Sequence, residues 1–213
     1  MADYNQTAEQ AAPAGNARRD YDLRPWLAKL QESGRLAVAK PGQALRFGIA
    51  GLANRLDGDR ALLAPAPHGA PEAAVISGLL SRREWMAEAL GIAPDALLRE
   101  FQAAAAKPLP WRVVEHAPCQ EVIHEGTAAN LETLLPIPTH NEHDSGAYIT
   151  AGLLICRDPK TGIQNVSIHR LQVSGPHELG ALLLPRHTFS YFAEAEQSGE
   201  DLEVAIVAVS YTH

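Results

Sequence analysis

The strongest constraint on the fold is a pair of β-type runs separated by a short turn sequence. Tyr148–Cys156 is rich in Ile, Leu and Thr, and Ile163–Val173 forms a second run of the same kind. Between them, Asp158–Gly162 carries the Asp, Pro and Gly residues that favour a turn. The pattern predicts a β-hairpin in which the two runs pair with each other.

The preceding half of the chain predicts a mixture of helices and short strands. Apolar residues at helical spacing follow Asp22, which can cap a helix that Gly34 can end. Ser81–Glu84 has the pattern of a capping box that starts a second helix. A third helix is predicted over residues 94–106, and short strands are predicted over residues 36–38 and 61–63.

A segment with two prolines, Lys107–Pro110, marks the predicted boundary within the 213 residues. We expect a disordered tail over residues 1–19, an N-terminal α/β portion over 20–110 and a second portion over 111–213. In the second portion, strands are predicted at Val113–Val114, Val122–Ile123 and Leu202–Val209, a turn capped by Asn130 runs through Leu134, and helices are predicted at Leu179–Leu184 and Phe189–Gln197.

Charge and cysteine content exclude several classes of protein. The formal net charge is −7 and no Lys/Arg block stands out, which argues against nucleic-acid binding and against a polybasic membrane role. No signal peptide and no apolar run of about 18 residues is present, so we expect a cytoplasmic protein. Cys119 and Cys156 have no metal-type spacing and are expected to be free thiols.

A polar segment, Thr139–Gly146, is the first candidate site. It places His140 and His143 three residues apart among carboxylates, as metal ligands can be. The segment is also bounded by Pro138 and a Gly, which is typical of a solvated loop, and we favour that interpretation.

The second predicted strand of the hairpin carries the best functional candidate. On a strand, Asn165, Ser167 and His169 share one face, so an amide and a hydroxyl suited to a phosphate or a hard metal lie together. Arg170 shares the opposite face with apolar residues, where an arginine is costly unless an anion pairs with it. The alternative is an arginine at a sheet edge that extends to water.

A third candidate, Pro185-Arg186-His187, follows the predicted helix Leu179–Leu184. Its cation and imidazole can simply complement a helix dipole, and alone they point to no site. Phosphate-binding glycine loops and nucleophile-elbow motifs are absent from the sequence. The residues themselves therefore indicate an α/β protein with a possible anion site on a β-hairpin.

Taken together and in order, several segments resemble the UbiD family of decarboxylases. They are Asp22–Arg24, Leu134–Pro138, Asp144–Thr150, Asp158–Gly162 and Asn165–Gln172. The resemblance covers nearly the whole chain after the N-terminal tail.

This resemblance implies an α+β fold, in which the N-terminal α/β portion leads into a flavin-reductase-like split β-barrel that is incomplete here. It implies a prenylated FMN cofactor, made with the help of a flavin prenyltransferase, and Mn²⁺ or Mg²⁺ with K⁺ at its phosphate. It implies reversible decarboxylation of an aromatic or α,β-unsaturated acid by a homo-oligomer, either a dimer or a hexamer.

The resemblance also assigns site residues. Asn165 and His187 match the metal ligands of the family, and Arg170 matches the arginine that holds the substrate carboxylate. The residues that match cofactor contacts are Ser167, Ile168, His169, Arg170, Gln172, Leu183, Leu184, Pro185 and Arg186.

The family has a third metal ligand and an acid/base carboxylate pair further along its chain. Glu194, Glu196 and Glu200 lie too early to match them, so we expect a truncation after the last strand and weak or no activity of this polypeptide alone. Two alternatives stay open: a non-catalytic cofactor-binding or assembly subunit that needs a partner chain for the carboxylates, and a plain flavin-binding split-barrel protein.

Overall fold

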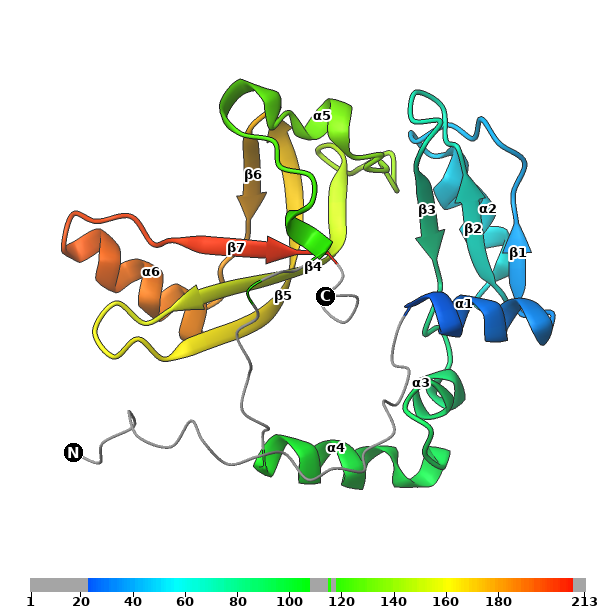
Figure 1. The fold of residues 1–213 in the computed structure, drawn as a ribbon, viewed down its shortest axis with the longest axis horizontal. Coiled ribbons are helices and arrows are strands. Elements are labelled where there is room, and N and C mark those ends of the chain that lie inside the picture. Colours follow the sequence, from blue (N-terminus) through cyan, green and yellow to red (C-terminus); the bar gives the residue numbers. More distant parts are fainter. Residues whose placement is uncertain (1–22, 108–114, 116–117, 209–213) are drawn as a thin grey trace.

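The structure is a computed structural model that describes residues 23–107, 115 and 118–208. It contains two β-sheets, one from each half of the chain (Figure 1). The N-terminal half comprises α1 (Leu23–Glu32), β1 (Leu36–Val38), α2 (Gly48–Leu56), β2 (Ala61–Pro65), β3 (Ala74–Ser77), α3 (Arg83–Ala89), a 3₁₀ turn η1 (Pro94–Ala96) and α4 (Leu97–Ala106). The second half comprises η2 (Pro118–Gln120), η3 (Gly126–Ala128), α5 (Leu131–Leu134), β4 (Tyr148–Arg157), β5 (Gln164–Gly175), β6 (Glu178–Ala181), α6 (His187–Gln197) and β7 (Val204–Val207).

The N-terminal sheet has the order β1-β2-β3, with β2 parallel to β1 and antiparallel to β3. The central strand is also the most buried, because Ala61, Leu62 and Ala64 leave almost no surface exposed. Ile49 of α2 packs against Leu62 and Ala64. Burial of this apolar surface is the main stabilising contribution to the N-terminal half.

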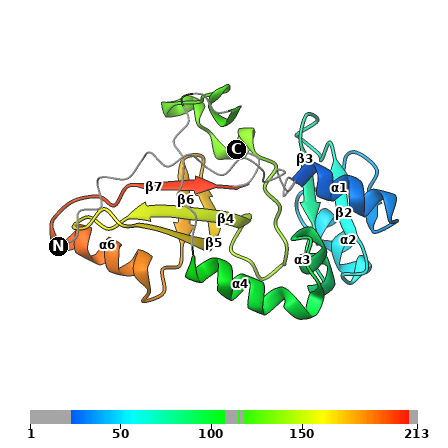
Figure 2. The same cartoon turned by 60° about the horizontal axis from the view of Figure 1, so that its bottom comes forward.

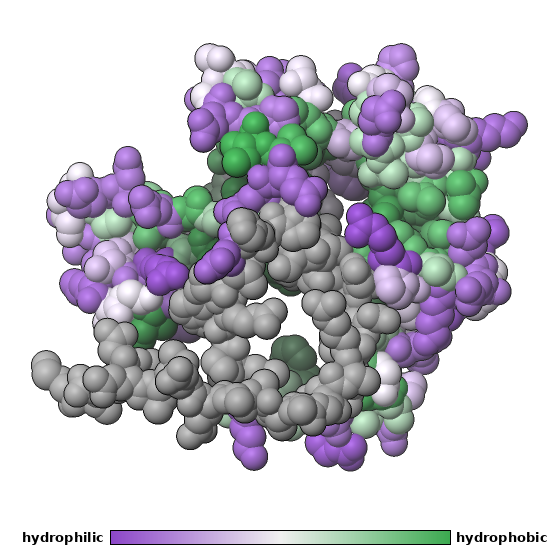
Figure 3. Space-filling model, viewed as in Figure 1, coloured by the Kyte–Doolittle hydropathy of each residue, from purple (hydrophilic) through white to green (hydrophobic). Residues whose placement is uncertain are grey.

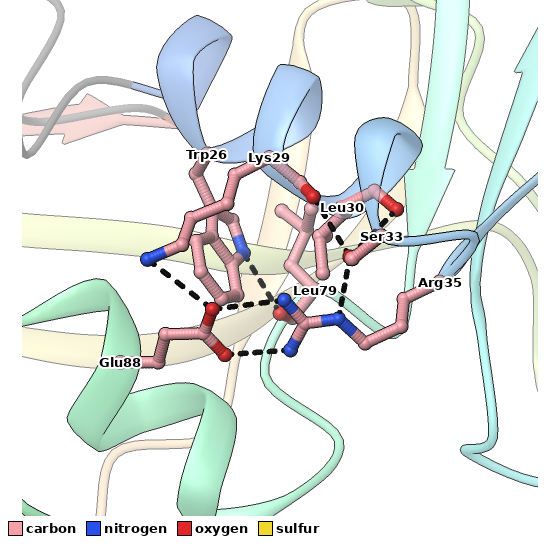
Figure 4. Close-up of polar contacts among 7 residues, drawn as sticks. All are labelled: Trp26, Lys29, Leu30, Ser33, Arg35, Leu79 and Glu88. Carbon is pink, nitrogen blue, oxygen red and sulfur yellow. Dashed lines mark hydrogen bonds and ion pairs between the residues drawn. The ribbon is translucent and has the colours of Figure 1, made fainter.

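A charged cluster ties α1 and the turn after it to α3 (Figure 4). The Arg35 guanidinium donates two hydrogen bonds to the Glu88 carboxylate, at 2.6 and 2.9 Å, and Lys29 Nζ lies 3.2 Å from the same carboxylate. The hydrogen bond from Arg35 is the main cause that lowers the pKa of Glu88 from 4.5 to about 2. Nearby, Trp26 Nε1 donates to the carbonyl of Leu79 at 3.0 Å.

The second sheet has the order β6-β5-β4-β7 and is antiparallel throughout. Helix α6 covers one of its faces (Figure 2). Tyr191 of α6 packs there against Leu154 and Cys156 of β4 and is 9% exposed. The register of β4 on β5 shifts between Ile149 and Gly152, which is a β-bulge or similar irregularity.

Backbone contacts join the segment before β4 to the N-terminal half. Phe47 N donates to the carbonyl of Thr139 at 3.0 Å, and Thr139 N donates to the carbonyl of Leu45 at 3.1 Å. These bonds form a bridge between two stretches that are far apart in sequence.

The hairpin prediction is confirmed, since β4 and β5 pair along most of their length. The strand predictions at residues 36–38 and 61–63 and the helix predictions at 94–106 and Phe189–Gln197 are confirmed as well. Asn130 caps α5 as expected, because its side chain accepts a hydrogen bond from Glu132 N at 2.9 Å.

The helix predicted over Leu179–Leu184 is wrong. Residues Glu178–Ala181 form strand β6, which returns along β5 after a tight turn. Gly180, which pairs with Gln172, is a weak helix former, and the available edge of β5 satisfies the backbone groups of this segment.

Two further predictions fail for local reasons. Val122 and Ile123 lie in irregular backbone between η2 and η3 and are 73% and 67% exposed. The capping box at Ser81 does not form, because the Ser81 hydroxyl donates to the carbonyl of Gly78 at 2.8 Å and α3 begins two residues later.

The last predicted strand is observed over Val204–Val207, and its final predicted residue lies outside the described residues. The predictions for residues 1–19, for the Asp22 cap and for Val113–Val114 also lie outside them. Helix α2 and strand β3 were not predicted.

Patches of hydrophobic surface are visible beside α5 and along the N-terminal sheet (Figure 3).

An apolar hollow of about 620 Å³ lies among α1, α3 and α4, and none of the predicted site residues lines it. Within the described ranges, every helix is too short or too polar to cross a membrane.

Candidate functional site

Strand β5 places the predicted residues on two faces of the second sheet, as the alternation requires. Asn165, Ser167 and His169 are half-buried on the face that α6 covers. Ile168 and Arg170 lie on the opposite face and are exposed, Ile168 by 74%. The predicted division of β5 into a polar face and an apolar face is therefore confirmed.

On the covered face, four polar side chains form a connected hydrogen-bonded cluster. Asn165 Nδ2 donates to Thr188 Oγ1 at 3.0 Å, and the hydroxyls of Thr188 and Ser167 lie 3.1 Å apart. Ser167 Oγ lies 2.9 Å from His169 Nε2. Three of these residues come from alternate positions of β5, and Thr188 comes from the first turn of α6.

The predicted residue His187 stands at the start of α6, and it is exposed. His187 is the first residue of the helix and directly precedes Thr188, which bonds Asn165. The first N–H groups of a helix lack intrahelical partners and favour an anion such as a phosphate. Arg186 and His187 also line a hollow of about 660 Å³ beside α6, so a cation and an imidazole border open space there.

Among the described residues, the edge of β5 alongside the cluster has no partner strand. Pairing between β5 and β6 covers Leu171–Gly175, and in the part of the chain that is described no strand pairs with Gln164–Arg170 on that side. The segment from Leu182 to Arg186 leaves the sheet where β6 ends and leads to α6. A ligand at this open edge can be contacted from both faces of β5, which explains how residues of opposite parity can serve one site.

The expectation that Arg170 is buried, and therefore needs an anionic partner, is not met. The side chain is exposed, and within the described ranges it forms no ion pair. An exposed arginine carries little desolvation cost and stays available to bind a carboxylate from solution.

The loop with His140 and His143 behaves as a solvated turn. Asn141 Oδ1 accepts from His143 N at 2.9 Å, and Asp144 Oδ2 accepts from Asn141 N at 3.0 Å. The described residues contain no cluster of three or more His, Cys, Asp or Glu side chains that could hold a metal ion. The interpretation of this loop as a metal site therefore has no support.

Asn165 and His187 offer an amide oxygen and an imidazole, two kinds of group that bind divalent cations. Asn165 Oδ1 is a hard oxygen donor, and among the described residues it accepts no hydrogen bond. An amide oxygen and an imidazole are too few ligands for Mn²⁺ or Mg²⁺, so the remaining positions need phosphate oxygens or carboxylates. The donor set fits a metal held jointly by the protein and a phosphate.

Thr188 is the residue of this cluster that sequence reasoning missed. Its burial, with 5% of the residue exposed, depends on how α6 packs on the sheet. A hydroxyl directly after a candidate histidine ligand at a predicted helix start is the only sequence signal that could have indicated it.

Comparisons with known proteins agree with the order of the two halves. Residues 27–105 match the 3-octaprenyl-4-hydroxybenzoate carboxy-lyase N-terminal domain. Residues 112–209 match the 3-octaprenyl-4-hydroxybenzoate carboxy-lyase Rift-related domain. The two matches together account for most of the chain.

Among curated relatives, the chain is 40% identical to the anhydromevalonate phosphate decarboxylase of Methanothermobacter thermautotrophicus over 132 residues, which is 62% of this chain and 30% of that protein. It is 31% identical to the phenolic acid decarboxylase of Bacillus subtilis over 200 residues, which is 87% of this chain and 42% of that protein. The chain therefore spans less than half the length of these relatives.

Among solved structures, the UbiD-class enzyme HmfF from Pelotomaculum thermopropionicum in complex with FMN superposes with a TM-score of 0.81 and 43% identity, over 86% of this chain and 41% of that one. An evolved dimeric form of HmfF in complex with prFMN gives a TM-score of 0.82 and 42% identity, over 87% of this chain and 44% of that one. The fold, the order of the two domains and the relatives agree, and the chain belongs to the UbiD family of decarboxylases, of which it contains the N-terminal and Rift-related domains.

Proposed function

We propose that the full-length protein is a UbiD-type (de)carboxylase that acts reversibly on an aromatic or α,β-unsaturated carboxylic acid with prenylated FMN. The observation that carries the proposal is the juxtaposition of the polar face of β5 with the start of α6 beside an open strand edge. HmfF, which this chain resembles over 86% of its length, is described in complex with FMN and with prFMN.

The cofactor lies along the open edge in this proposal. Ser167, Ile168, His169, Arg170 and Gln172 contact it from β5, and Leu183, Leu184, Pro185 and Arg186 contact it from the connection to α6. Ile168, Leu182 and Leu184 are 74%, 63% and 61% exposed, so apolar surface is available for an aromatic ring system.

The phosphate of the cofactor lies at the start of α6. Asn165 Oδ1 and the His187 imidazole would hold Mn²⁺ or Mg²⁺ there, and the phosphate oxygens would supply further hard ligands. K⁺ is proposed at the same phosphate. Arg186 and the free N–H groups of the first turn add positive potential.

When bound, the cofactor supplies a conjugated system that accepts the electron pair left by departing carbon dioxide. Arg170 binds the substrate carboxylate by charge-assisted hydrogen bonds and orients the bond that breaks. A general acid must then protonate the carbon, and we propose that it lies in the part of the relatives' length that this chain does not span.

The test is decarboxylation of a panel of aromatic and α,β-unsaturated acids by the full-length protein, produced together with a flavin prenyltransferase. We expect Arg170→Ala to abolish carbon dioxide release while largely sparing cofactor binding. Arg157→Ala is the matched control, because Arg157 is an exposed arginine at the end of β4, away from the open edge of β5, and should keep activity. Turnover retained by Arg170→Ala contradicts the role of that residue.

A further inference from the structure

Thr188 is a buried hydroxyl at a position where the helix fold alone does not need one. In the part of the chain that is described, it is the one polar or charged side chain that is almost fully buried, with 5% exposed. It occupies the second position of α6, directly after the proposed ligand His187. A buried hydroxyl is costly unless it is hydrogen-bonded, so its partners indicate its purpose.

The partners of Thr188 allow a continuous order of donors and acceptors that begins at the Asn165 amide. An amide nitrogen can only donate, so Asn165 Nδ2 donates to Thr188 Oγ1 at 3.0 Å. The proton of Thr188 is then free to reach Ser167 Oγ at 3.1 Å, and Ser167 can donate to His169 Nε2 at 2.9 Å. In this order each hydroxyl both accepts and donates, and Thr188 Oγ1 also lies 4.0 Å from the Cys156 thiol.

In this arrangement the nitrogen is the engaged end of the Asn165 amide. Nδ2 is engaged by Thr188 at 3.0 Å and lies 3.4 Å from Ser167, whereas Oδ1 accepts no bond from any described residue. Only the oxygen of an amide can bind a metal ion, because the NH₂ group is a donor. Loss of the acceptor at Thr188 would let the amide turn its nitrogen outward.

We propose that Thr188 is a positioning residue that holds the Asn165 amide with Oδ1 directed toward the cation at the cofactor phosphate. The proposal rests on the proposed function, since it assigns a second residue to the same metal site. It explains why a hydroxyl lies buried between β5 and the start of α6.

The first test compares Thr188→Val, which removes the hydroxyl at nearly constant size, with Thr188→Ser, which keeps it. The readout is the Mn²⁺ affinity of the full-length protein in the presence of FMN, measured by equilibrium dialysis and elemental analysis. Loss of an outer partner of a metal ligand typically lowers affinity ten- to hundredfold, and we expect roughly that loss for Thr188→Val. Thr188→Ser should bind close to wild type, and equal affinity of both variants overturns the proposal.

The Asn165→Asp variant distinguishes a positioning role of Thr188 from a purely structural one. In Asn165→Asp the side chain presents an oxygen in either orientation, so adding Thr188→Val should cost little Mn²⁺ affinity there. A purely structural role of Thr188 predicts the same loss in both backgrounds, and that result contradicts the proposal. Thermal melting of all four proteins shows whether each is folded.

A measurement without metal distinguishes this inference from the proposed function. In metal-free, FMN-free protein, the Asn165 side-chain amide protons should exchange with solvent more slowly in wild type and Thr188→Ser than in Thr188→Val, as NMR can detect. The same exchange rate in all three overturns the role of Thr188. Slow exchange combined with no Mn²⁺ binding by wild type supports that role in orienting the amide and counts against the metal site itself.

Discussion

Arg35 and Glu88 form a two-point ion pair, with N–O distances of 2.6 and 2.9 Å, that joins the turn between α1 and β1 to helix α3. Lys29 reaches the same carboxylate from α1, so one carboxylate holds three segments together (Figure 4). The arrangement lies apart from β5 and α6, and it concerns the stability of the N-terminal half rather than chemistry.

We expect Glu88→Gln to destabilise the protein by about 1 kcal/mol, because the pair is bidentate but its carboxylate is about a third exposed. The free energy of unfolding in urea measures this. Glu32→Gln is the matched control, since Glu32 forms no ion pair among the described residues and should change stability little. An equal effect of both substitutions contradicts a role of the ion pair.

The same pair predicts a pH dependence. The pKa of Glu88 is lowered from 4.5 to about 2, so the folded state favours the ionised carboxylate. Its stabilising contribution is complete above pH 4.5 and is lost as the pH falls from there toward 2. The difference in stability between wild type and Glu88→Gln should shrink across that range, and a constant difference would show that the carboxylate is not the cause.

A substitution at Gly152 tests the packing of β4 on β5. A Cβ at this position would lie 2.9 Å from Cδ1 of Leu171, and Leu171 is 1% exposed, so it has little freedom to move away. We expect Gly152→Ala to lower the free energy of unfolding by about 1–3 kcal/mol through overpacking. The matched control is Gly51→Ala, because Gly51 lies in helix α2 and an added Cβ has nothing within 4 Å, so this substitution should not destabilise the protein. Gly162→Ala is not a suitable control because Gly162 has a φ of 70°.

Substitutions of His187 and His140 distinguish between the two candidate metal sites. We expect His187→Ala to lower the Mn²⁺ content of the purified full-length protein, because one of few protein ligands is lost, and His140→Ala to leave it unchanged. Elemental analysis of both variants checks this. Metal content that falls with His140→Ala and not with His187→Ala would move the site to the loop.

The hairpin and the two faces of β5 could be predicted from sequence because strand alternation is a local property. Asp158–Gly162 supplies turn chemistry, and the position of Asn165, Ser167 and His169 on one face follows from parity alone. The open edge of β5 could not be predicted, because it depends on where pairing with β6 stops.

The segments whose structure was predicted wrongly or missed depend on contacts with other parts of the fold. Leu179–Leu184 has helix-forming leucines, yet Glu178–Ala181 pairs with β5 because that edge was available. Helix α2 was missed because Gly48 and Gly51 suggest a loop, while Ile49 and its apolar neighbours gain enough from packing on β2 to form a helix. Thr188 was missed because nothing local predicts the burial of a hydroxyl.

The most direct test of the central claim is the identity of the cofactor. The full-length protein, produced together with a flavin prenyltransferase, is purified and its bound small molecule is identified by mass spectrometry and an absorbance spectrum. We expect prenylated FMN that is retained together with Mn²⁺ or Mg²⁺ and is bound in a lower amount by Asn165→Ala. Unmodified FMN or FAD bound without any dependence on metal would contradict it and favour a plain flavin-binding protein.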